Sequence, residues 1–352
     1  VQKKQDDTRR SSNGPRTRIP KTNKDRNEWT LLGIGGYDIN RLNTDLKNPD
    51  DHQKYLLDWL PESRQWSYTL GTTFKHYGNN WYHFFVLSRS GLYNKVEKYT
   101  GNDRHNPKTI DYRSGESENK FRFEHHRYAA NGFKLQVGAG IEYAHYDNTT
   151  ARRLFTAGEA IDQYYSRALN MWKWAVFGQV SRSFFSERLA LSLGLRADGC
   201  NYTGKTAALY RQISPRFSFS YAFDERWSLN GNIGRYYQLP AYTTLGFADA
   251  GGVLVNKRNK TGYIGADHYV LGVEYRPGTT TRITLEGFYK TYDHYPVSLT
   301  DSVALANKGT DYVAVGDEAV RPVGEGRAYG LGLMLRTQEF YGVVASLSYT
   351  WY

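Results

Sequence analysis

Three short patterns in the sequence combine residue types that do chemistry in other proteins. Ser117 and Lys120 have the Ser-x-x-Lys spacing of a serine nucleophile beside a lysine, but the sequence lacks the companion motifs of that enzyme class. His125 and His126 are neighbours on an expected strand, so their rings point to opposite faces and do not share one metal ion. The glycines at 33–36 lack the strand–helix context of a nucleotide-binding loop. The sequence therefore predicts no enzyme, no metal site and no cofactor.

A larger set of residues has side chains that suit the binding of a ligand. Aromatic rings stack on sugars and on other ring systems, and arginine binds anionic groups. Such residues stand in the expected long connections between strands. The candidates are Trp59 in the first connection, Arg152, Arg153, Tyr164 and Tyr165 in the third, Tyr210 and Arg211 in the fourth, and Tyr242 and Asp249 in the fifth. Tyrosine at strand ends also forms the aromatic girdles of membrane barrels, so these residues have a structural alternative.

Polar side chains also recur at every second position of the expected strands. In a membrane barrel this polar face lines the lumen, where it borders an aqueous path or bonds to a domain that fills the barrel. The residues of the polar face are Lys134, Gln136, Glu142, Gln179, Arg196, Asp198, Arg216, Glu274, Glu286 and Arg336. The residue types alone are compatible with both uses.

The elements that position these residues are strands, because apolar and polar residues alternate over long stretches. Four leucines alternate with Ala, Ser, Gly and Arg in 189–198, and 133–144 and 213–223 have the same period of two. Soluble strands typically have about 5 or 6 residues, whereas a tilted strand needs about 9 to 11 to cross a bilayer. The pattern therefore predicts an all-β fold, an antiparallel transmembrane β-barrel with its apolar face toward lipid.

About thirteen strands are expected, and the connections between them alternate in length. The strands are 28–39, 66–76, 81–98, 118–128, 132–146, 172–184, 187–202, 212–223, 226–237, 268–276, 281–293, 326–337 and 342–352. Short connections fall near 77–80, 129–131, 185–187, 224–225, 277–280 and 338–341, and long ones near 40–65, 99–117, 147–171, 203–211, 238–267 and 294–325. Outer-membrane barrels have short periplasmic turns and long extracellular loops, which fixes the orientation. Such barrels have even strand counts, so either the count is off by one or further strands lie outside this sequence.

Composition excludes a helical membrane protein and argues against a nucleic-acid partner. The 352 residues include 30 tyrosines, yet the mean hydropathy is −0.68 and no run approaches the roughly 20 apolar residues of a spanning helix. The net charge is +11, and residues 1–27, with nine basic and three acidic side chains, carry over half of it. This segment has no aromatic residues for base stacking, so we expect a solvated, basic lead-in that the turn pattern places on the periplasmic side.

Four segments, taken in order, resemble the β-barrel of TonB-dependent receptors of the bacterial outer membrane. They are 175–202 (AVFGQVSRSFFSERLALSLGLRADGCNY), 214–240 (SPRFSFSYAFDERWSLNGNIGRYYQLP), 269–296 (YVLGVEYRPGTTTRITLEGFYKTYDHYP) and 326–350 (GRAYGLGLMLRTQEFYGVVASLSYT). They contain a Gly-Gln strand, a Gly-Leu-Arg strand, a Ser-Pro-Arg strand, a Gly-Arg-Tyr-Tyr-Gln-x-Pro strand end and a Gly-Arg-Ala-Tyr-Gly hairpin. The likeness is good over 175–352 and looser over 66–150.

The resemblance implies a 22-stranded barrel whose lumen holds a plug domain. It divides the chain into a lead-in segment, 1–27, and a partial barrel, 28–352, with the plug domain and some strands outside this sequence. The polar face would then contact the plug domain of the same full-length chain, and outer-membrane lipid would surround the barrel. A TonB complex would bind by strand addition at a box that also lies outside this sequence.

The function implied by the resemblance is active import across the outer membrane of a Gram-negative bacterium. The ligand would be a scarce small molecule or glycan, with siderophores, haem and cobalamin among the options. Two alternatives stay open at this point. A self-contained passive porin would conduct without a partner, and a non-transporting surface barrel would bind ligand without uptake.

Overall fold

The structure is a computed structural model, and fourteen strands make up most of it. It describes residues 17–18, 27–44, 46–156, 159–249, 251–308, 316–340 and 343–352. The strands are β1 (Thr17–Arg18), β2 (Asn27–Asn40), β3 (Glu62–Tyr77), β4 (Trp81–Tyr99), β5 (Lys108–Tyr128), β6 (Lys134–Thr156), β7 (Glu159–Phe184), β8 (Leu189–Cys200), β9 (Ile213–Ala222), β10 (Trp227–Gln238), β11 (Ile264–Tyr275), β12 (Thr281–Ser298), β13 (Val320–Phe340) and β14 (Val343–Trp351).

Short helices lie in the connections. They are α1 (Asp51–Trp59), η1 (Thr100–Asn102), α2 (Gly204–Ala207), η2 (Leu209–Arg211), α3 (Tyr242–Leu245), α4 (Val255–Arg258) and η3 (Leu305–Asn307). The longest of them, α1, begins with a capping box in which Asp50 and Gln53 bond to each other's backbone N–H. Within the described residues, none of the helices has the length and apolarity that a membrane-spanning helix requires.

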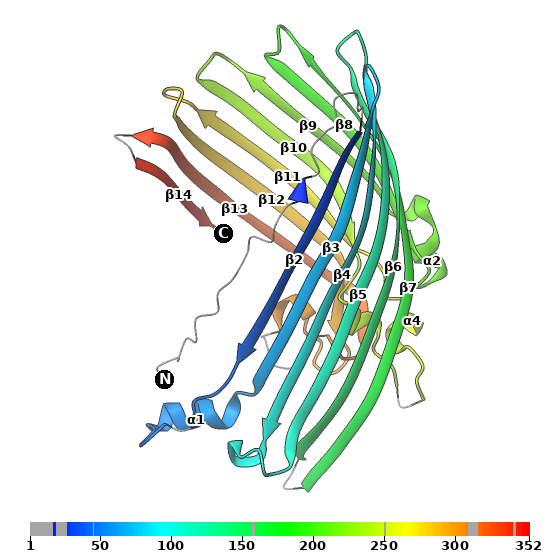
Figure 1. The fold of residues 1–352 in the computed structure, drawn as a ribbon, viewed down its shortest axis with the longest axis vertical. Coiled ribbons are helices and arrows are strands. Elements are labelled where there is room, and N and C mark those ends of the chain that lie inside the picture. Colours follow the sequence, from blue (N-terminus) through cyan, green and yellow to red (C-terminus); the bar gives the residue numbers. More distant parts are fainter. Residues whose placement is uncertain are drawn as a thin grey trace.

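All strands belong to one antiparallel sheet in which each strand pairs with its neighbours in sequence. Figure 1 shows this sheet curving into an open trough, with β2 and β14 near its two edges and α1 at the lower end. Such up-and-down order needs only local hairpin connections. The thirteen expected strands correspond to β2–β14, which confirms the prediction of an antiparallel β-barrel sheet.

The convex face of the sheet is apolar, and aromatic residues border the apolar band. Leu271, Leu285 and Leu331 point outward and are exposed on neighbouring strands. Tyr269 and Tyr329 flank Tyr289 across β11–β13 with ring centroids 6.4 Å apart in each pair. Toward the opposite, short-turn end, Trp227 stacks on Tyr275 at 4.3 Å. A band of apolar residues between aromatic rows is the lipid-facing surface of an outer-membrane barrel.

Two expected long connections are wrong. In the structure most of residues 99–117 and 147–171 are in strands: β5 begins at Lys108, β6 runs to Thr156 and β7 begins at Glu159. Polar pairs hold these extensions together: the guanidinium of Arg153 donates to both oxygens of Asp162 at 2.6 and 2.8 Å. Beyond the lipid band the outward face of a strand meets water and no longer has to be apolar. The apolar alternation therefore stops there although the strand continues.

The expected lead-in segment 1–27 lies outside the described residues, except for β1 and Asn27. β1 pairs with β2, where Thr17 stands opposite Leu31 and Arg18 opposite Thr30. The sequence did not predict this strand, because two residues are too few to show an alternating pattern.

The turn between β9 and β10 provides a test of the short connections. Its Asp224 accepts hydrogen bonds from the backbone N–H groups of Arg226 and Trp227, at 2.7 Å each, and these bonds hold the pKa of Asp224 below its ordinary value. A lowered carboxyl pKa stabilises the fold at pH values above about 4, and this contribution disappears as pH falls through the folded-state pKa. We expect Asp224→Ala to lower the melting temperature in detergent at pH 7 and to have a smaller effect at pH 3.

The matched control is Glu225→Ala, which changes the neighbouring exposed residue and should leave both melting temperatures unchanged. A deficit of Asp224→Ala that is equally large at both pH values would show that the charge of Asp224 does not matter.

Candidate functional site

The connection between β10 and β11 folds back onto the concave face of the sheet. Its Leu245 is fully buried and packs in a cluster with Tyr146, Met171, Cys200 and Tyr202 of the wall and of the β8–β9 connection. The hydroxyl of Tyr202 donates to the backbone oxygen of Leu245 at 2.7 Å. Apolar residues in a loop bury themselves where a surface is available, and here that surface is the inside of the trough.

A cavity of about 720 Å³ lies between this connection and the wall of β4–β8. Charged residues on its wall are Glu116, Glu118, Lys120, Arg122, Glu142, Lys173, Arg196 and Asp198, and aromatic residues around it are Phe121, Trp174, Phe177, Tyr237, Tyr242 and Tyr263. This volume is in the range of sites for small ligands.

One row across three strands supplies the charges at the centre of the cavity wall. Lys120 of β5, Glu142 of β6 and Lys173 of β7 stand directly opposite one another, so their side chains share the concave face. Glu118, two residues before Lys120 on the same face of β5, lies 2.5 Å from Lys120 and 3.1 Å from Lys173. Lys173 also pairs with Glu142. Two lysines and two glutamates thus form one closed ion network.

Tyr242 of α3 joins the β10–β11 connection to this network. Its hydroxyl lies 2.6 Å from the ammonium of Lys173 and donates to Glu118. Burial raises the pKa of Tyr242, and the hydrogen bond to the Glu118 carboxylate raises it further. The hydroxyl therefore stays protonated, and it holds the connection over the cavity as a hydrogen-bond donor.

A second part of the wall combines guanidinium groups with an aromatic face. Arg122 and Arg196 both stand over the ring of Phe177, at 4.8 and 5.9 Å from its centroid. Arg196 also makes a double hydrogen bond to Asp198, at 2.6 and 2.8 Å. Because cations and a ring face meet here, the wall suits a ligand that carries both aromatic and anionic groups.

The connection between β12 and β13 is also attached to the wall. Asp317 pairs with Arg167 of β7, and both side chains are only 9% exposed. The hydroxyl of Tyr165 donates to Asp317 as well, and Arg167 stands 4.5 Å from the centroid of Phe247 in the β10–β11 connection. One buried arginine therefore contacts both inward-folded connections.

Asn256 of α4 ties the two connections to each other. Its amide donates to the backbone oxygens of Thr244 at 2.7 Å and Glu318 at 2.8 Å, and its oxygen accepts from the N–H of Val320 at 2.8 Å. The donors and acceptors of these three bonds are all buried or half-buried. The two connections therefore act as one packed unit on the wall.

The predicted ligand residues are only partly brought together. Tyr242 lines the cavity, and Tyr165 contacts the inward-folded β12–β13 connection. Asp249 instead accepts hydrogen bonds from Gly251 and Val253 of its own connection, both at 3.0 Å. Its carboxylate therefore shapes a turn.

The other predicted ligand residues lie away from the cavity. Trp59 is on α1, 57% exposed, and stacks on Tyr55 at 6.1 Å. Tyr210 and Arg211 are on η2, where Tyr210 is 71% exposed. The residues expected in the third connection are on strands instead, which corrects their placement: Arg152 and Arg153 on β6, and Tyr164 and Tyr165 on β7. Tyr164 is exposed on the outward face of β7 and does not reach the cavity.

The register of the strands places all ten residues of the predicted polar face on the concave side of the sheet, and the apolar residues on the outward side. Glu142, Arg196 and Asp198 line the cavity. Toward the short turns, Gln136 donates to Glu124 at 2.8 Å and Gln179 to Ser192 at 2.9 Å. Other residues of this face have local partners or are exposed: Arg216 stands over Tyr236, Glu274 is clamped by Arg276 and Arg282, and Lys134, Glu286 and Arg336 are exposed.

Sequence reasoning missed Glu118, Lys120 and Lys173. The sequence contains a signal for these residues. When the expected strands 118–128, 132–146 and 172–184 are aligned as hairpins, opposite charges stand across from each other. That step needs the register of each hairpin, which depends on turn geometry.

Known proteins share this architecture. A family model described as TonB dependent receptor-like, beta-barrel matches residues 2–352. A search of curated protein sequences found no match. Among solved structures, the ferric enterobactin receptor PfeA of Pseudomonas aeruginosa is 17% identical with a TM-score of 0.62, over 92% of this chain and 48% of that one.

Two further structures match in the same way. The pyoverdine receptor FpvA of Pseudomonas aeruginosa is 12% identical with a TM-score of 0.59, over 93% of this chain and 54% of that one. The ferric-catecholate import receptor Fiu of Escherichia coli is 11% identical with a TM-score of 0.57, over 92% of this chain and 55% of that one. The chain spans about half the length of these structures, and identities this low indicate a shared fold. With the family model matching almost every residue, the chain belongs to the TonB-dependent receptors and is part of a β-barrel in the outer membrane of a Gram-negative bacterium.

Proposed function

We propose that this chain forms part of the barrel wall of a receptor that captures a ferric siderophore outside the cell. The receptor imports this ligand with energy that the TonB complex supplies. The observation that carries the proposal is the cavity of about 720 Å³ on the concave face, between the inward-folded β10–β11 connection and the wall of β4–β8. Its aromatic and guanidinium groups suit siderophores, which combine aromatic or polar chelating groups with anionic charge. The matched receptors for enterobactin, pyoverdine and ferric catecholates support this ligand class.

The partners follow from the same proposal. A plug domain of the full-length receptor would contact the polar concave face, and a TonB complex would supply energy by strand addition at a box outside this sequence. The role is transport, with no chemical step and no resident cofactor. A passive porin is the less favoured function, because two connections fold into the space that a porin leaves open.

Binding to the purified receptor tests the ligand class. We expect ferric enterobactin or ferric pyoverdine to quench tryptophan fluorescence at submicromolar to micromolar concentrations, and haemin, cyanocobalamin and maltooligosaccharides to have no effect. Tyr242→Ala should weaken binding by at least about tenfold, because it removes a ring and a hydroxyl from the cavity.

The matched control is Tyr210→Ala, which removes an equally large ring from an exposed position outside the cavity. It should change affinity by less than about threefold. Binding of haemin, cobalamin or a glycan alone would contradict the siderophore assignment. Steady conductance in planar bilayers without any ligand binding would favour the porin instead.

A further inference from the structure

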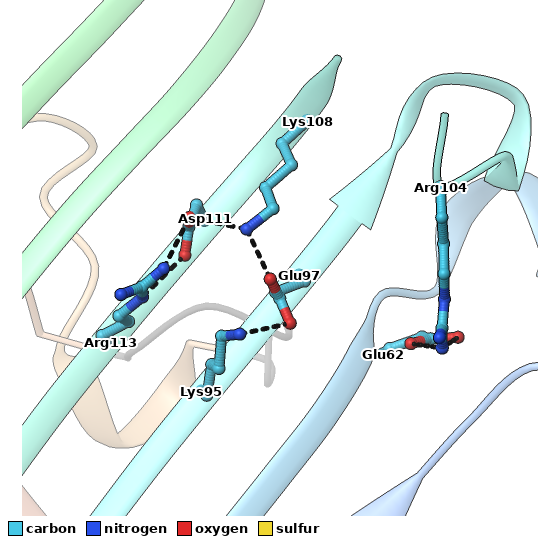
Figure 2. Close-up of polar contacts among 7 residues, drawn as sticks. All are labelled: Glu62, Lys95, Glu97, Arg104, Lys108, Asp111 and Arg113. Carbon is cyan, nitrogen blue, oxygen red and sulfur yellow. Dashed lines mark hydrogen bonds and ion pairs between the residues drawn. The ribbon is translucent and has the colours of Figure 1, made fainter. Parts of the chain in front are cut away.

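Three basic residues form an uninterrupted row on the outward face of β3–β5. Arg64 of β3 stands opposite Lys95 of β4, and Lys95 stands opposite Arg113 of β5. Figure 2 shows Lys95 and Arg113 projecting from neighbouring strands in this region. Side chains directly opposite one another on one face lie about 5 Å apart at their Cβ atoms. The row therefore concentrates three positive charges on the outside of the barrel.

The row sits just beyond the aromatic girdle of this part of the sheet. Trp66 and Tyr93, two positions nearer the membrane on β3 and β4, stack at 4.7 Å and face outward. Two residues of strand span about 7 Å, and the girdle marks the level of the lipid headgroups. Since long connections are at this end of the strands, the three cations stand at the headgroups of the outer leaflet.

Two carboxylates farther from the membrane, Glu97 and Asp111, are shared by Lys95, Arg113 and a further cation, Lys108, so this part of the face keeps a positive balance. Glu97 lies 2.8 Å from Lys95 and 2.5 Å from Lys108, and Asp111 lies 2.8 Å from Lys108 and 3.1 Å from Arg113 (Figure 2). The Arg113 side chain is still 60% exposed and that of Lys95 35%. Each keeps N–H groups that are free to bind an anion from the membrane side.

An apolar groove lies on the same outward face, nearer the middle of the membrane. Its volume is about 730 Å³. Gly33 leaves it open, because the position opposite Leu70 carries no side chain. Arg89 closes its upper end, where it donates to Tyr68 at 2.9 Å and to Asn119 at 2.8 Å. The groove is lined by Leu31, Leu32, Gly33, Leu70, Gly71, Thr72, Leu87, Ser88, Arg89 and Asn119.

Among the described residues of β10–β13, no outward row sets three cations side by side: Arg235 stands opposite Asp267, which stands opposite Thr291, which stands opposite Arg327. Beyond the tyrosines of β11–β13, the outward Arg235 lies 2.7 Å from Asp267 and also pairs with Asp293. Two carboxylates, Asp267 and Asp293, thus balance the two cations Arg235 and Arg327 in this region. The excess of positive charge outside the girdle is a feature of β3–β5, and it does not follow from barrel architecture in general.

We propose that the outward face of β2–β5 binds a phosphorylated, multiply acylated glycolipid of the outer leaflet. The phosphates would bind Arg64, Lys95 and Arg113, and one acyl chain would lie along the groove between Leu70 and Leu87. Guanidinium and ammonium groups recognise phosphate by charge and hydrogen bonding, and a leucine-lined groove recognises hydrocarbon. This site is independent of the proposed import function, because it lies on the opposite face from the cavity.

Native mass spectrometry of the receptor, purified from outer membranes and stripped of lipid, tests the site with lipid A as the probe. The triple variant Arg64→Gln/Lys95→Gln/Arg113→Gln should bind bis-phosphorylated lipid A at least tenfold more weakly than the unmodified receptor. The control Lys134→Gln/Arg188→Gln/Arg226→Gln removes the same charge from exposed positions near the short turns and should bind normally. Monophosphoryl lipid A should bind the unmodified receptor more weakly than the bis-phosphorylated form.

A second variant tests the groove and keeps every charge. A Cβ at Gly33 would meet Leu70 at 3.4 Å, an ordinary contact, so Gly33→Phe should fold and fill the groove. We expect it to lose lipid A binding as well. Both variants should keep their ferric siderophore affinity, which separates this proposal from the proposed function. Equal lipid A binding by all variants, equal binding of phosphatidylglycerol, or displacement of lipid A by millimolar inorganic phosphate would overturn it.

Discussion

Arg167→Met should destabilise the receptor by about 3–5 kcal/mol, the usual cost of removing one partner from a buried ion pair. Arg167 and Asp317 are each 9% exposed, so the substitution leaves a largely buried carboxylate without its cation. It also removes the guanidinium from the face of Phe247. The free energy of unfolding, from urea titration in lipid vesicles, measures the loss. The double variant Arg167→Met/Asp317→Asn should lose less than the two single variants together, because it leaves no unpaired charge.

The matched control for this pair is Arg153→Met, which breaks the exposed pair with Asp162. Here 37% and 68% of the two side chains are exposed, so the expected cost is below about 1 kcal/mol. Equal effects of the Arg167 and Arg153 substitutions would contradict the buried attachment of the β12–β13 connection.

Lys173→Met should release the β10–β11 connection from the wall. The ammonium of Lys173 lies between Glu118 and Glu142 and contacts the Tyr242 hydroxyl, so its loss leaves two carboxylates with one lysine between them. These side chains are 18–22% exposed, and the cost is therefore about 2 kcal/mol, below that of a fully buried pair. If this free energy opens the connection locally, amide exchange in 239–263 becomes about 30-fold faster, which hydrogen-exchange mass spectrometry measures.

Lys134→Met is the control for this substitution, because it removes a lysine from an exposed position of the same face. It should leave exchange in 239–263 unchanged. Unchanged exchange in Lys173→Met would mean that the apolar cluster around Leu245 holds the connection without the ion network.

The lipid-embedded part of the fold was predictable, because each strand there meets lipid on one face and polar surroundings on the other. The alternation on β8 shows this contrast directly, with leucine at positions 189, 191, 193 and 195. Above the membrane the contrast ends, and Arg152 and Tyr164 were therefore expected in a loop although they continue β6 and β7. The strand extensions depend on pairing with neighbours, which a single sequence does not encode as a pattern.

The candidate site was predictable only in its residue types. Tyr242 was expected to meet ligand because it is an aromatic residue in a long connection, and it does line the cavity. Its contact with Glu118 joins residues 124 positions apart, and only the folding of the connection into the trough brings them together. Trp59 and Tyr210 have equally suitable side chains, but both are exposed and neither lines the cavity. Loop conformation, which depends on tertiary packing, decided between them.

Uptake of radiolabelled ferric siderophore by intact cells tests the central claim most directly. Cells that lack the receptor gene are compared with cells that carry it on a plasmid, each with and without a functional TonB complex, under iron limitation. We predict concentrative uptake of ferric enterobactin or ferric pyoverdine only when both receptor and TonB are present, and reduced uptake with Tyr242→Ala. Uptake that is independent of the receptor, or that persists without TonB, would contradict the assignment of this barrel as an energised siderophore importer.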